Sequence, residues 1–202
     1  MRGRFIVLEG IDGCGKTTQS QLLQRALQRR GMRPLRLREP GGTPIGEAVR
    51  ELLLDPASGD LASWTEVFLF MASRAQLLDE RVRPALARGT TVILDRYYYS
   101  TAAYQGAAGG VGVPVVLGLA RTARLDAPDR VFVLDIDPAA ARERLGRTRD
   151  RMERKGAAYQ RRVRRGFLAM ARRDPKRLKV IDAGRPPAHV HDEIMKEVAR
   201  VL

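Results

Sequence analysis

A glycine-rich segment near the start of the chain carries the residues best suited to chemistry. Residues 10–17, GIDGCGKT, fit the pattern G-x-x-x-x-G-K-[ST], with an apolar run before them and a helical pattern after them. Glycines let successive backbone N–H groups point at phosphate oxygens, and the N-terminus of the following helix adds partial positive charge. The pattern predicts a loop that binds the triphosphate of a nucleotide.

The polar residues of this loop have distinct predicted roles. Lys16 is expected to bridge the β- and γ-phosphates, and the Thr17 hydroxyl is expected to be a ligand of Mg²⁺. Cys14 stands at a variable position of the loop, and we assign it no nucleophilic role. The residues expected around ATP are Gly10, Ile11, Asp12, Gly13, Cys14, Gly15, Lys16, Thr17 and Thr18.

The loop alone leaves three classes open, namely GTPase, ATP-driven motor and small-molecule kinase. Guanine-reading GTPases use an N-K-x-D element, and the chain contains no Asn. Motors usually carry a strand that ends in adjacent acidic residues, one of which activates water. Here the strand-like run TVILD ends in Asp95 followed by Arg96, and a guanidinium suits gripping a phosphate better than activating water. These features favour a kinase.

Five short β-rich runs, separated by stretches long enough for helices, indicate the scaffold. Most are nearly continuous in Val, Ile and Leu, as in strands that helices cover on both faces. The second alternates with Arg, which indicates a strand that is near an edge or partly exposed. The spacing predicts an α/β fold with a five-stranded parallel sheet. The runs cover residues 5–9, 34–38, 91–95, 131–136 and 178–182.

Helical patterns fill the intervals between these runs. The segment 106–114, GAAGGVGVP, is expected to be a flexible loop. No repeat or composition break divides the chain, so we expect residues 1–202 to form a single domain. The predicted helices cover residues 17–30, 45–54, 63–88, 115–124, 139–145, 151–173 and 188–201.

The net charge and the cysteine content limit which classes of partner and which cellular setting are expected. The formal charge of +14 suggests a polyanionic partner, but only five of the 37 basic residues are Lys, so composition bias explains the charge equally well. We expect no specific nucleic-acid partner. A single Cys and two His offer neither a disulfide nor zinc-ligand spacing, which favours a reducing, cytoplasmic setting. No run of 18 apolar residues occurs, so no membrane partner is expected.

Five segments, in order and spacing, resemble the thymidylate kinase family, which phosphorylates dTMP to dTDP. The likeness runs over nearly the whole chain and implies a P-loop nucleoside monophosphate kinase-like fold with helices on both faces of the sheet. It also implies ATP and dTMP as substrates, Mg²⁺ as cofactor, a place in dTTP synthesis and a homodimer. The segments are EGIDGCGKTT at 9–18, REPGGTPIGEAVR at 38–50, LFMASRAQ at 69–76, DRYYYSTAAYQG at 95–106 and RDRMERKGAAYQRRVRRGFL at 149–168.

The resemblance implies how the dTMP base and sugar are held. Phe70 would stack on thymine, and Arg74, four residues later on the same helix face, would bond its carbonyl edge. Thr101 and Gln105, also four apart, could present polar atoms to the base, and Tyr104 would crowd a 2′-hydroxyl. Without the resemblance, Phe70 would be interpreted as a core residue and Arg74 as a solvated charge.

The same likeness places residues at the acceptor phosphate. Arg96 would grip it, Asp95 would support Mg²⁺ through water, and Asp12 would reach the 3′-hydroxyl of the sugar. A cap on the following helix is the alternative role for Asp12. Arg50, and less favourably Arg38, would help to hold the phosphate. The full set expected at dTMP is Asp12, Arg38, Arg50, Phe70, Arg74, Arg96, Thr101, Tyr104 and Gln105.

A basic segment at about 142–155 matches the mobile lid of the bacterial type of the family. Family members place a catalytic Arg either in the P-loop or on the lid, and the loop position after Asp12 is here Gly13. We therefore expect the catalytic cation to come from the lid. The predicted catalytic residues are Lys16, Arg96 and Arg149, with Arg147 and Arg151 as neighbouring candidates.

Two alternatives remain open. One is another nucleoside monophosphate kinase of the same fold. The other is a basic, ATP-driven nucleic-acid-binding protein, suggested by the charge of +14 and the Arg-rich segment 142–173.

Overall fold

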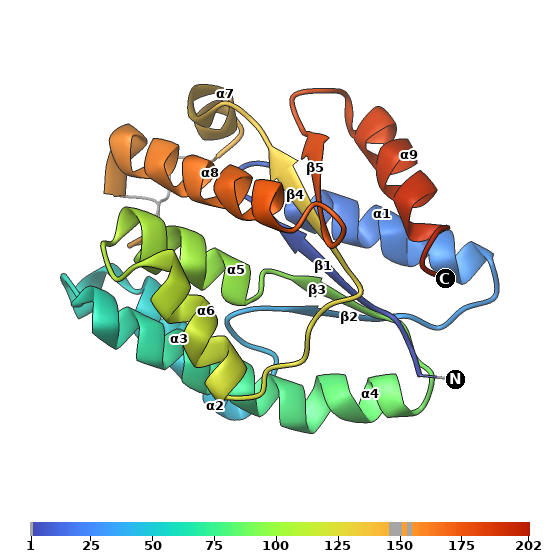
Figure 1. The fold of residues 1–202 in the computed structure, drawn as a ribbon, viewed down its shortest axis with the longest axis horizontal. Coiled ribbons are helices and arrows are strands. Elements are labelled where there is room, and N and C mark those ends of the chain that lie inside the picture. The colour runs from blue at the N-terminus through green and yellow to red at the C-terminus, as the bar shows by residue number, and fades with distance from the viewer. Residues whose placement is uncertain (1, 146–150, 153–154) are drawn as a thin grey trace.

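A five-stranded parallel sheet forms the centre of the computed structural model, which describes residues 2–145, 151–152 and 155–202 (Figure 1). The strand order is β2-β3-β1-β4-β5, and all four pairings are parallel. The predicted sheet is confirmed, and the Arg-alternating strand lies at an edge. The strands are β1 Phe5–Glu9, β2 Leu35–Arg38, β3 Val92–Asp95, β4 Arg130–Asp135 and β5 Leu178–Asp182.

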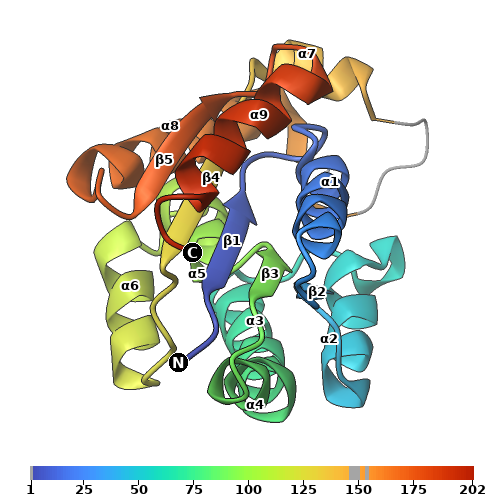
Figure 2. The same ribbon diagram turned by 90° about the vertical axis from the view of Figure 1, so that its right-hand side faces the viewer.

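Helices cover both faces of this sheet (Figure 1). Helices α1 and α9 pack together on one face, while α3, α5, α6 and α8 lie on the other. Figure 2 shows α3 between α2 and α6. The helices are α1 Lys16–Arg29, α2 Pro44–Leu54, α3 Ser63–Leu77, α4 Arg83–Ala87, α5 Tyr98–Thr101, α6 Val113–Thr122, α7 Pro138–Glu143, α8 Gly156–Arg173 and α9 Pro187–Val198. Short segments of other helical type cover Pro56–Ser58, Leu78–Val82 and Ala102–Ala108.

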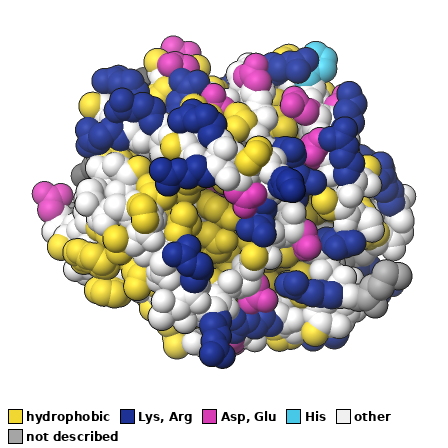
Figure 3. All heavy atoms as spheres, viewed as in Figure 1, with side chains coloured by type: hydrophobic (Ala, Val, Ile, Leu, Met, Phe, Trp, Pro, Cys, Tyr) yellow, Lys and Arg dark blue, Asp and Glu magenta, His cyan; other side chains and the backbone are white. Residues whose placement is uncertain are grey.

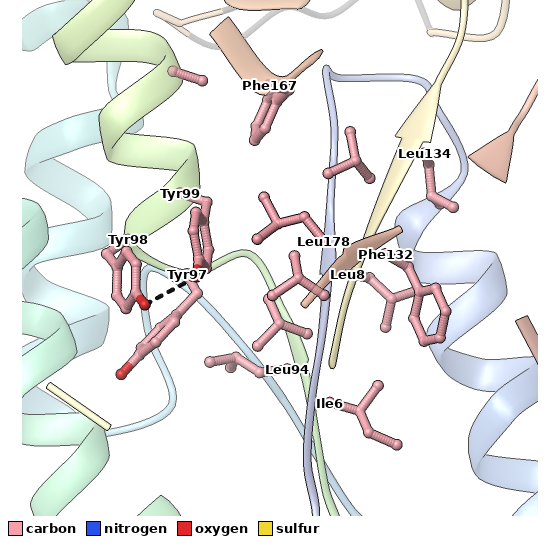
Figure 4. Packing of buried hydrophobic residues seen from close by; sticks show 14 of the residues in the cluster. Ile6, Leu8, Leu94, Tyr97, Tyr98, Tyr99, Phe132, Leu134, Phe167 and Leu178 are labelled. Carbon is pink, nitrogen blue, oxygen red and sulfur yellow. Dashed lines mark hydrogen bonds between the residues drawn. The ribbon is translucent and has the colours of Figure 1, made fainter. Parts of the chain in front are cut away.

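The core lies between the sheet and the helices that cover it. All five residues of β1 are buried, which explains why its sequence is apolar up to Glu9. Each large apolar side chain removed from water contributes about 1.5–3 kcal/mol. The rings of Tyr97, Tyr98 and Tyr99 pack into this core, where the Tyr98 hydroxyl donates to that of Tyr99 over 3.1 Å (Figure 4).

The register of the sheet brings the chemically active segments together. Leu8 of β1 lies opposite Asp95 of β3, so the two strands end side by side. The glycine-rich loop follows β1 directly, and Arg96 follows β3 directly. Ligands of open α/β sheets bind at the carboxyl ends of the strands, which is where both segments lie.

The segment predicted as one helix over 63–88 is helical up to Ala87, but its hydrogen-bonding pattern changes along its length. Helix α3 passes into a π-helical stretch at Leu78–Val82, and α4 follows. Pro84 has no N–H to donate to the carbonyl four residues earlier, and a π-helical insertion is one way to accommodate that loss. None of the helices in the described ranges combines the length and apolar content that a membrane span needs.

Two sequence-based boundaries were wrong. The helix predicted from residue 151 begins at Gly156 instead, and the Arg151 N–H bonds the Leu54 carbonyl at the end of α2. The loop predicted over 106–114 is shorter, since the π-helical segment extends to Ala108 and α6 begins at Val113. Small residues there suggested a loop, although they pack closely against α8.

Candidate active site

The loop after β1 has a backbone that requires glycine. Gly10, Gly13 and Gly15 all have positive φ, which side chains with a Cβ rarely adopt. A Cβ on Gly13 would also lie 2.2 Å from the Ala141 carbonyl oxygen. No side chain of the described residues caps α1, so its first N–H groups face the loop without a side-chain acceptor. This arrangement suits an anion and does not support a capping role for Asp12.

Lys16 is buried inside the loop. Its Nζ donates to the Ile11 carbonyl over 2.9 Å and to the Gly10 carbonyl over 3.1 Å, and lies 3.6 Å from Cys14 Sγ. Burial raises the pKa of the Cys14 thiol, so it stays protonated and is a poor nucleophile. The structure thus places one ammonium group where a bound polyphosphate would lie.

The two residues predicted to serve Mg²⁺ lie in contact. The Thr17 hydroxyl donates to Asp95 Oδ2 over 2.9 Å. Among the described residues, no group of three or more His, Cys, Asp or Glu side chains could hold a metal ion. Mg²⁺ keeps several waters and takes few protein ligands beside substrate phosphates, so this pair of oxygen-bearing side chains fits it.

A cleft of about 570 Å³ surrounds the loop, and we call it the phosphate cleft. Its volume is in the range of nucleotide-sized ligand sites. Seven of the nine residues predicted to bind ATP, Asp12 to Thr18, line it, whereas Gly10 and Ile11 contribute the carbonyls that hold Lys16. The remaining lining residues are Gln19, Arg38, Glu39, Arg50, Asp95, Arg96, Arg144, Leu145, Ala183, Arg185, Pro187 and Val190.

Arg96, Asp12 and Tyr104 form a bonded group beside the loop. Arg96 pairs with the Asp12 carboxylate, and the Tyr104 hydroxyl donates to Asp12 Oδ2 over 2.8 Å. Burial alone would raise the pKa of Asp12, but the charges of Arg96 and Lys16 and the Tyr104 bond together lower it. Arg96 also has a φ of 71°, a costly conformation for a residue with a side chain. Asp12 is therefore an ionised loop residue that is held by Arg96, the residue directly after β3.

Glu9 holds the start of α5 in place. Its carboxylate accepts from the backbone N–H groups of Tyr97 and Ser100 over 2.8 and 3.1 Å, and from the Ser100 hydroxyl over 2.5 Å. Ser100 Oγ accepts in turn from Arg96 over 3.0 Å. Burial raises the pKa of Glu9 to about 7, although its hydrogen bonds and the nearby Arg96 act in the opposite direction.

This raised pKa predicts a pH-dependent stability. Between pH 4.5 and about 7 the folded protein binds more protons at Glu9 than the unfolded chain does, so the free energy of unfolding falls as pH rises through that window. Glu9→Gln removes this contribution, so the difference between wild type and variant changes by about 3 kcal/mol across the window. Urea unfolding measured across this range checks it. Parallel curves for the two proteins would contradict the assignment.

A second, inner pocket adjoins the phosphate cleft. Four residues line both, namely Asp12, Glu39, Arg50 and Arg96. Of the nine residues predicted at dTMP, Arg38 alone is outside the inner pocket's lining; it lines the phosphate cleft and pairs with Glu47. The inner pocket is lined by Asp12, Glu39, Pro40, Arg50, Leu54, Phe70, Arg74, Arg96, Ser100, Thr101, Tyr104, Gln105 and Met152.

Arg74 is almost completely buried at the wall of this pocket. Its Nη2 lies 2.6 Å and its Nε 2.7 Å from Glu39 Oε2. Its Nη1 lies 3.5 Å from Met71 Sδ. The guanidinium can only donate hydrogen bonds, and Arg74 lines the inner pocket. Phe70, one helical turn earlier, lines the same pocket and is partly exposed. Glu39 therefore fixes a donor on a pocket wall that also carries an aromatic ring.

The predicted lid residues differ in what the structure shows. Arg147 and Arg149 lie outside the described residues. Arg151 is buried, and its guanidinium donates to Glu66 Oε1 over 2.6 Å and to the Leu53 carbonyl over 2.9 Å. This placement favours a structural role for Arg151, whereas Arg144 lines the phosphate cleft.

Sequence reasoning missed Glu66 and the contacts that it makes. Glu66 accepts from Gln105, Arg151 and Lys155, three residues that lie far from it in the chain. One signal was present, because Glu66 precedes Phe70 by four residues and therefore shares its helix face. Its partners could not be identified because only the tertiary fold brings them together.

A phosphate-binding loop that opens onto a smaller pocket lined by guanidinium groups suits transfer from a nucleotide to a small phosphorylated acceptor. The fold and site thus define a P-loop kinase. A family model described as Thymidylate kinase matches residues 8–194. The chain therefore belongs to the thymidylate kinase family, and it is a phosphotransferase.

Individual relatives agree with this assignment. The thymidylate kinase of Pelotomaculum thermopropionicum is 45% identical over 206 residues, covering 100% of this chain and 95% of the relative. That of Deinococcus radiodurans is 44% identical over 203 residues, covering 98% and 97%. A crystal structure of thymidylate kinase from Ehrlichia chaffeensis is similar with a TM-score of 0.80 and 33% identity, covering 98% of this chain and 99% of that one.

Proposed function

We propose that this protein transfers the γ-phosphoryl group of ATP to dTMP and so forms dTDP, a step in dTTP synthesis. The conversion of dTMP to dTDP is the reaction of the family to which the chain belongs. The observation that carries the assignment of the acceptor site is the inner pocket, which Phe70, Arg74 and Gln105 line together next to the phosphate cleft. An aromatic ring, a donor and an acceptor suit a flat base whose edge presents both a carbonyl and an N–H group.

The chemistry needs alignment and cations more than a base. A phosphate acceptor is already ionised at neutral pH, so no residue has to remove a proton from it. Lys16 would stabilise the β- and γ-phosphates, and Arg96, which lines both clefts, would hold the acceptor phosphate. Thr17 and Asp95 would hold Mg²⁺, which supplies neutralisation of phosphate charge when bound. Asp12 would bond the 3′-hydroxyl of the sugar.

The proposal also covers the domain organisation and the cellular location of the enzyme. We infer one catalytic domain over residues 1–202, supported by the family match over 8–194. We also infer a cytoplasmic location, with which the buried free thiol of Cys14 is compatible.

A panel of acceptors tests the proposed substrate. ADP release is measured with ATP and Mg²⁺ against dTMP, dUMP, dGMP, dAMP and thymidine at equal concentrations. The proposal expects the highest kcat/KM for dTMP. Preference for a purine monophosphate or for the free nucleoside would overturn it, and weak discrimination between dTMP and dUMP would indicate another kinase of the same fold.

We further propose that the catalytic arginine comes from the lid, as in the bacterial type of the family. The Gly13 geometry supports this, because a side chain there would collide with the Ala141 carbonyl and an arginine could not be accommodated without a shift of the loop or of α7. The proposal expects Arg149→Ala to lower kcat about 100-fold while the KM for dTMP changes little. Single-turnover rates of Arg147→Ala and Arg149→Ala are compared. Full turnover by Arg149→Ala would transfer the role to its neighbour.

An exposed apolar face supports the proposal of a homodimer. On α3, the rings of Trp64 and Phe68 stack with centroids 5.6 Å apart although 45% and 59% of the residues' surfaces are exposed. Val115 on α6 is also 43% exposed. Figure 3 shows hydrophobic side chains gathered at its lower left, over the region where α3 lies in Figure 1. Such a patch is typical of a protein interface.

Phe68→Glu tests the dimer. A charge in the middle of the proposed interface should convert the protein to a monomer, because an unpaired buried charge costs several kcal/mol. Sedimentation velocity measures the change. Val180→Glu is the matched control, because Val180 is also exposed but lies on β5. A dimer that survives Phe68→Glu would place the interface elsewhere.

A further inference from the structure

Glu66 is a fully buried carboxylate beneath the inner pocket. It lies on α3 and accepts from Gln105 Nε2 over 2.8 Å, from Arg151 over 2.6 Å and from Lys155 Nζ over 2.8 and 3.1 Å. Burial alone would raise its pKa, but the hydrogen bonds from Lys155, Gln105 and Arg151 together lower it. Glu66 is therefore ionised and can only accept hydrogen bonds.

This carboxylate fixes the orientation of the Gln105 amide. The amide nitrogen must face Glu66, because the reverse orientation would set the amide oxygen against a carboxylate oxygen. Gln105 Oε1 is consequently directed elsewhere, and it is buried with no hydrogen-bond partner in the described part of the chain. Gln105 also lines the inner pocket. The pocket thus contains a hydrogen-bond acceptor, Gln105 Oε1, whose orientation is set by Glu66.

Arg74 has the opposite polarity and the same kind of support. Glu39, a second buried carboxylate, holds its guanidinium by two short contacts, and this donor-only group lines the pocket. Glu39 in the pocket wall therefore fixes a donor, Arg74, and Glu66 behind the wall fixes an acceptor, Gln105. Thymine and uracil match this pattern with an O4 acceptor beside an N3–H donor, whereas cytosine presents an N4 amine beside an unprotonated N3.

We propose that Glu66 is a positioning residue that determines base specificity by holding Gln105 as a hydrogen-bond acceptor toward the ring N3–H of dTMP. The proposal rests on the proposed function. It assigns the rejection of cytosine to the polarity of the pocket and not to its size. It does not bear on thymine against uracil, which present the same edge.

Glu66→Gln is the decisive variant, because it should make Gln105 present a donor instead of an acceptor to the base with almost no change in side-chain shape. The introduced amide directs its oxygen to Arg151 and Lys155, so its nitrogen faces Gln105. Gln105 then turns its oxygen toward that nitrogen and its own nitrogen toward the base. The expected result is a higher KM for dTMP with a smaller change in kcat, together with a fall of about 100-fold in the preference for dTMP over dCMP.

A second substitution should restore the original polarity. In the double variant Glu66→Gln with Gln105→Glu, the carboxylate at position 105 accepts from the new amide and presents its other oxygen to the base. The net charge of the cluster also returns to its original value. We expect the preference for dTMP over dCMP to recover to within about tenfold of wild type, because the acceptor is again in place. A purely structural loss at Glu66 would not be reversed by this change.

The measurement is kcat and KM for dTMP and dCMP with the full-length wild type, the single variant, the double variant and a control. Glu197→Gln on α9 is the control, since it makes the same chemical change far from the pocket. An equal loss with both substrates in the single variant, or no recovery in the double variant, would overturn the inference. If the single variant does not fold, the double variant decides alone, because the inference requires it to prefer dTMP. Failure of the proposed function is distinguishable, because the wild type itself would then not prefer dTMP.

Discussion

Replacing Lys16 with alanine should lower the rate of phosphoryl transfer by about a thousandfold or more. Lys16 has the one ammonium group buried in the loop among the described residues, and the loop carbonyls that hold it are 2.9 and 3.1 Å away. The charge that develops on the transferred group would then have no cation from the loop to stabilise it. Because the loop backbone depends on its glycines and not on Lys16, the fold should persist.

The measurement is kcat at saturating ATP and dTMP, accompanied by thermal unfolding. Lys196→Ala on α9 is the matched control, because it removes an exposed ammonium group that lines neither cleft. The control should retain wild-type turnover. Near-normal turnover by Lys16→Ala would show that the loop does not bind the transferred phosphate.

Arg96→Ala should lower kcat/KM for dTMP by a similar factor, about a thousandfold. Arg96 touches both clefts and neutralises Asp12. Its loss removes the cation proposed to grip the acceptor phosphate, and it also leaves the negative charge of Asp12 beside that phosphate. Attraction of the acceptor phosphate is then replaced by repulsion, so the expected loss is large.

Two further variants separate charge from geometry at this position. Arg96→Lys keeps the charge but loses the planar fork that can donate two parallel bonds, so it should recover only part of the activity. Arg88→Ala, which removes an exposed guanidinium after α4, should have no effect. If Arg96→Ala raised the KM for ATP and left that for dTMP unchanged, Arg96 would belong to the donor site.

Strands and loop could be predicted because their signals are local. The run Phe5–Glu9 is buried on both sides, so its composition alone indicated a strand. The glycine positions report positive φ directly. In contrast, the start of α8 at Gly156 and the contact of Arg151 with the end of α2 are not contained in any local pattern.

The site shows the same division. Phe70 and Arg74 could be paired from their spacing on one helix, and both line the inner pocket. The carboxylates that hold Arg74 and Gln105 could not be identified from the sequence. Glu39 and Glu66 meet these partners only through tertiary packing. The π-helical segment that carries Tyr104 and Gln105 was also missed, since its Ala and Gly residues resemble a loop.

Phosphoryl transfer from ATP to dTMP is tested most directly by ³¹P NMR, which detects substrates and products together. Purified protein is mixed with ATP, Mg²⁺ and excess dTMP, and ³¹P NMR spectra are recorded over time. We expect dTDP and ADP to appear in equal amounts, with almost no inorganic phosphate and no dependence on added DNA or RNA. Release of inorganic phosphate without dTDP, above all if nucleic acid stimulated it, would contradict the assignment of the two adjoining clefts to ATP and dTMP.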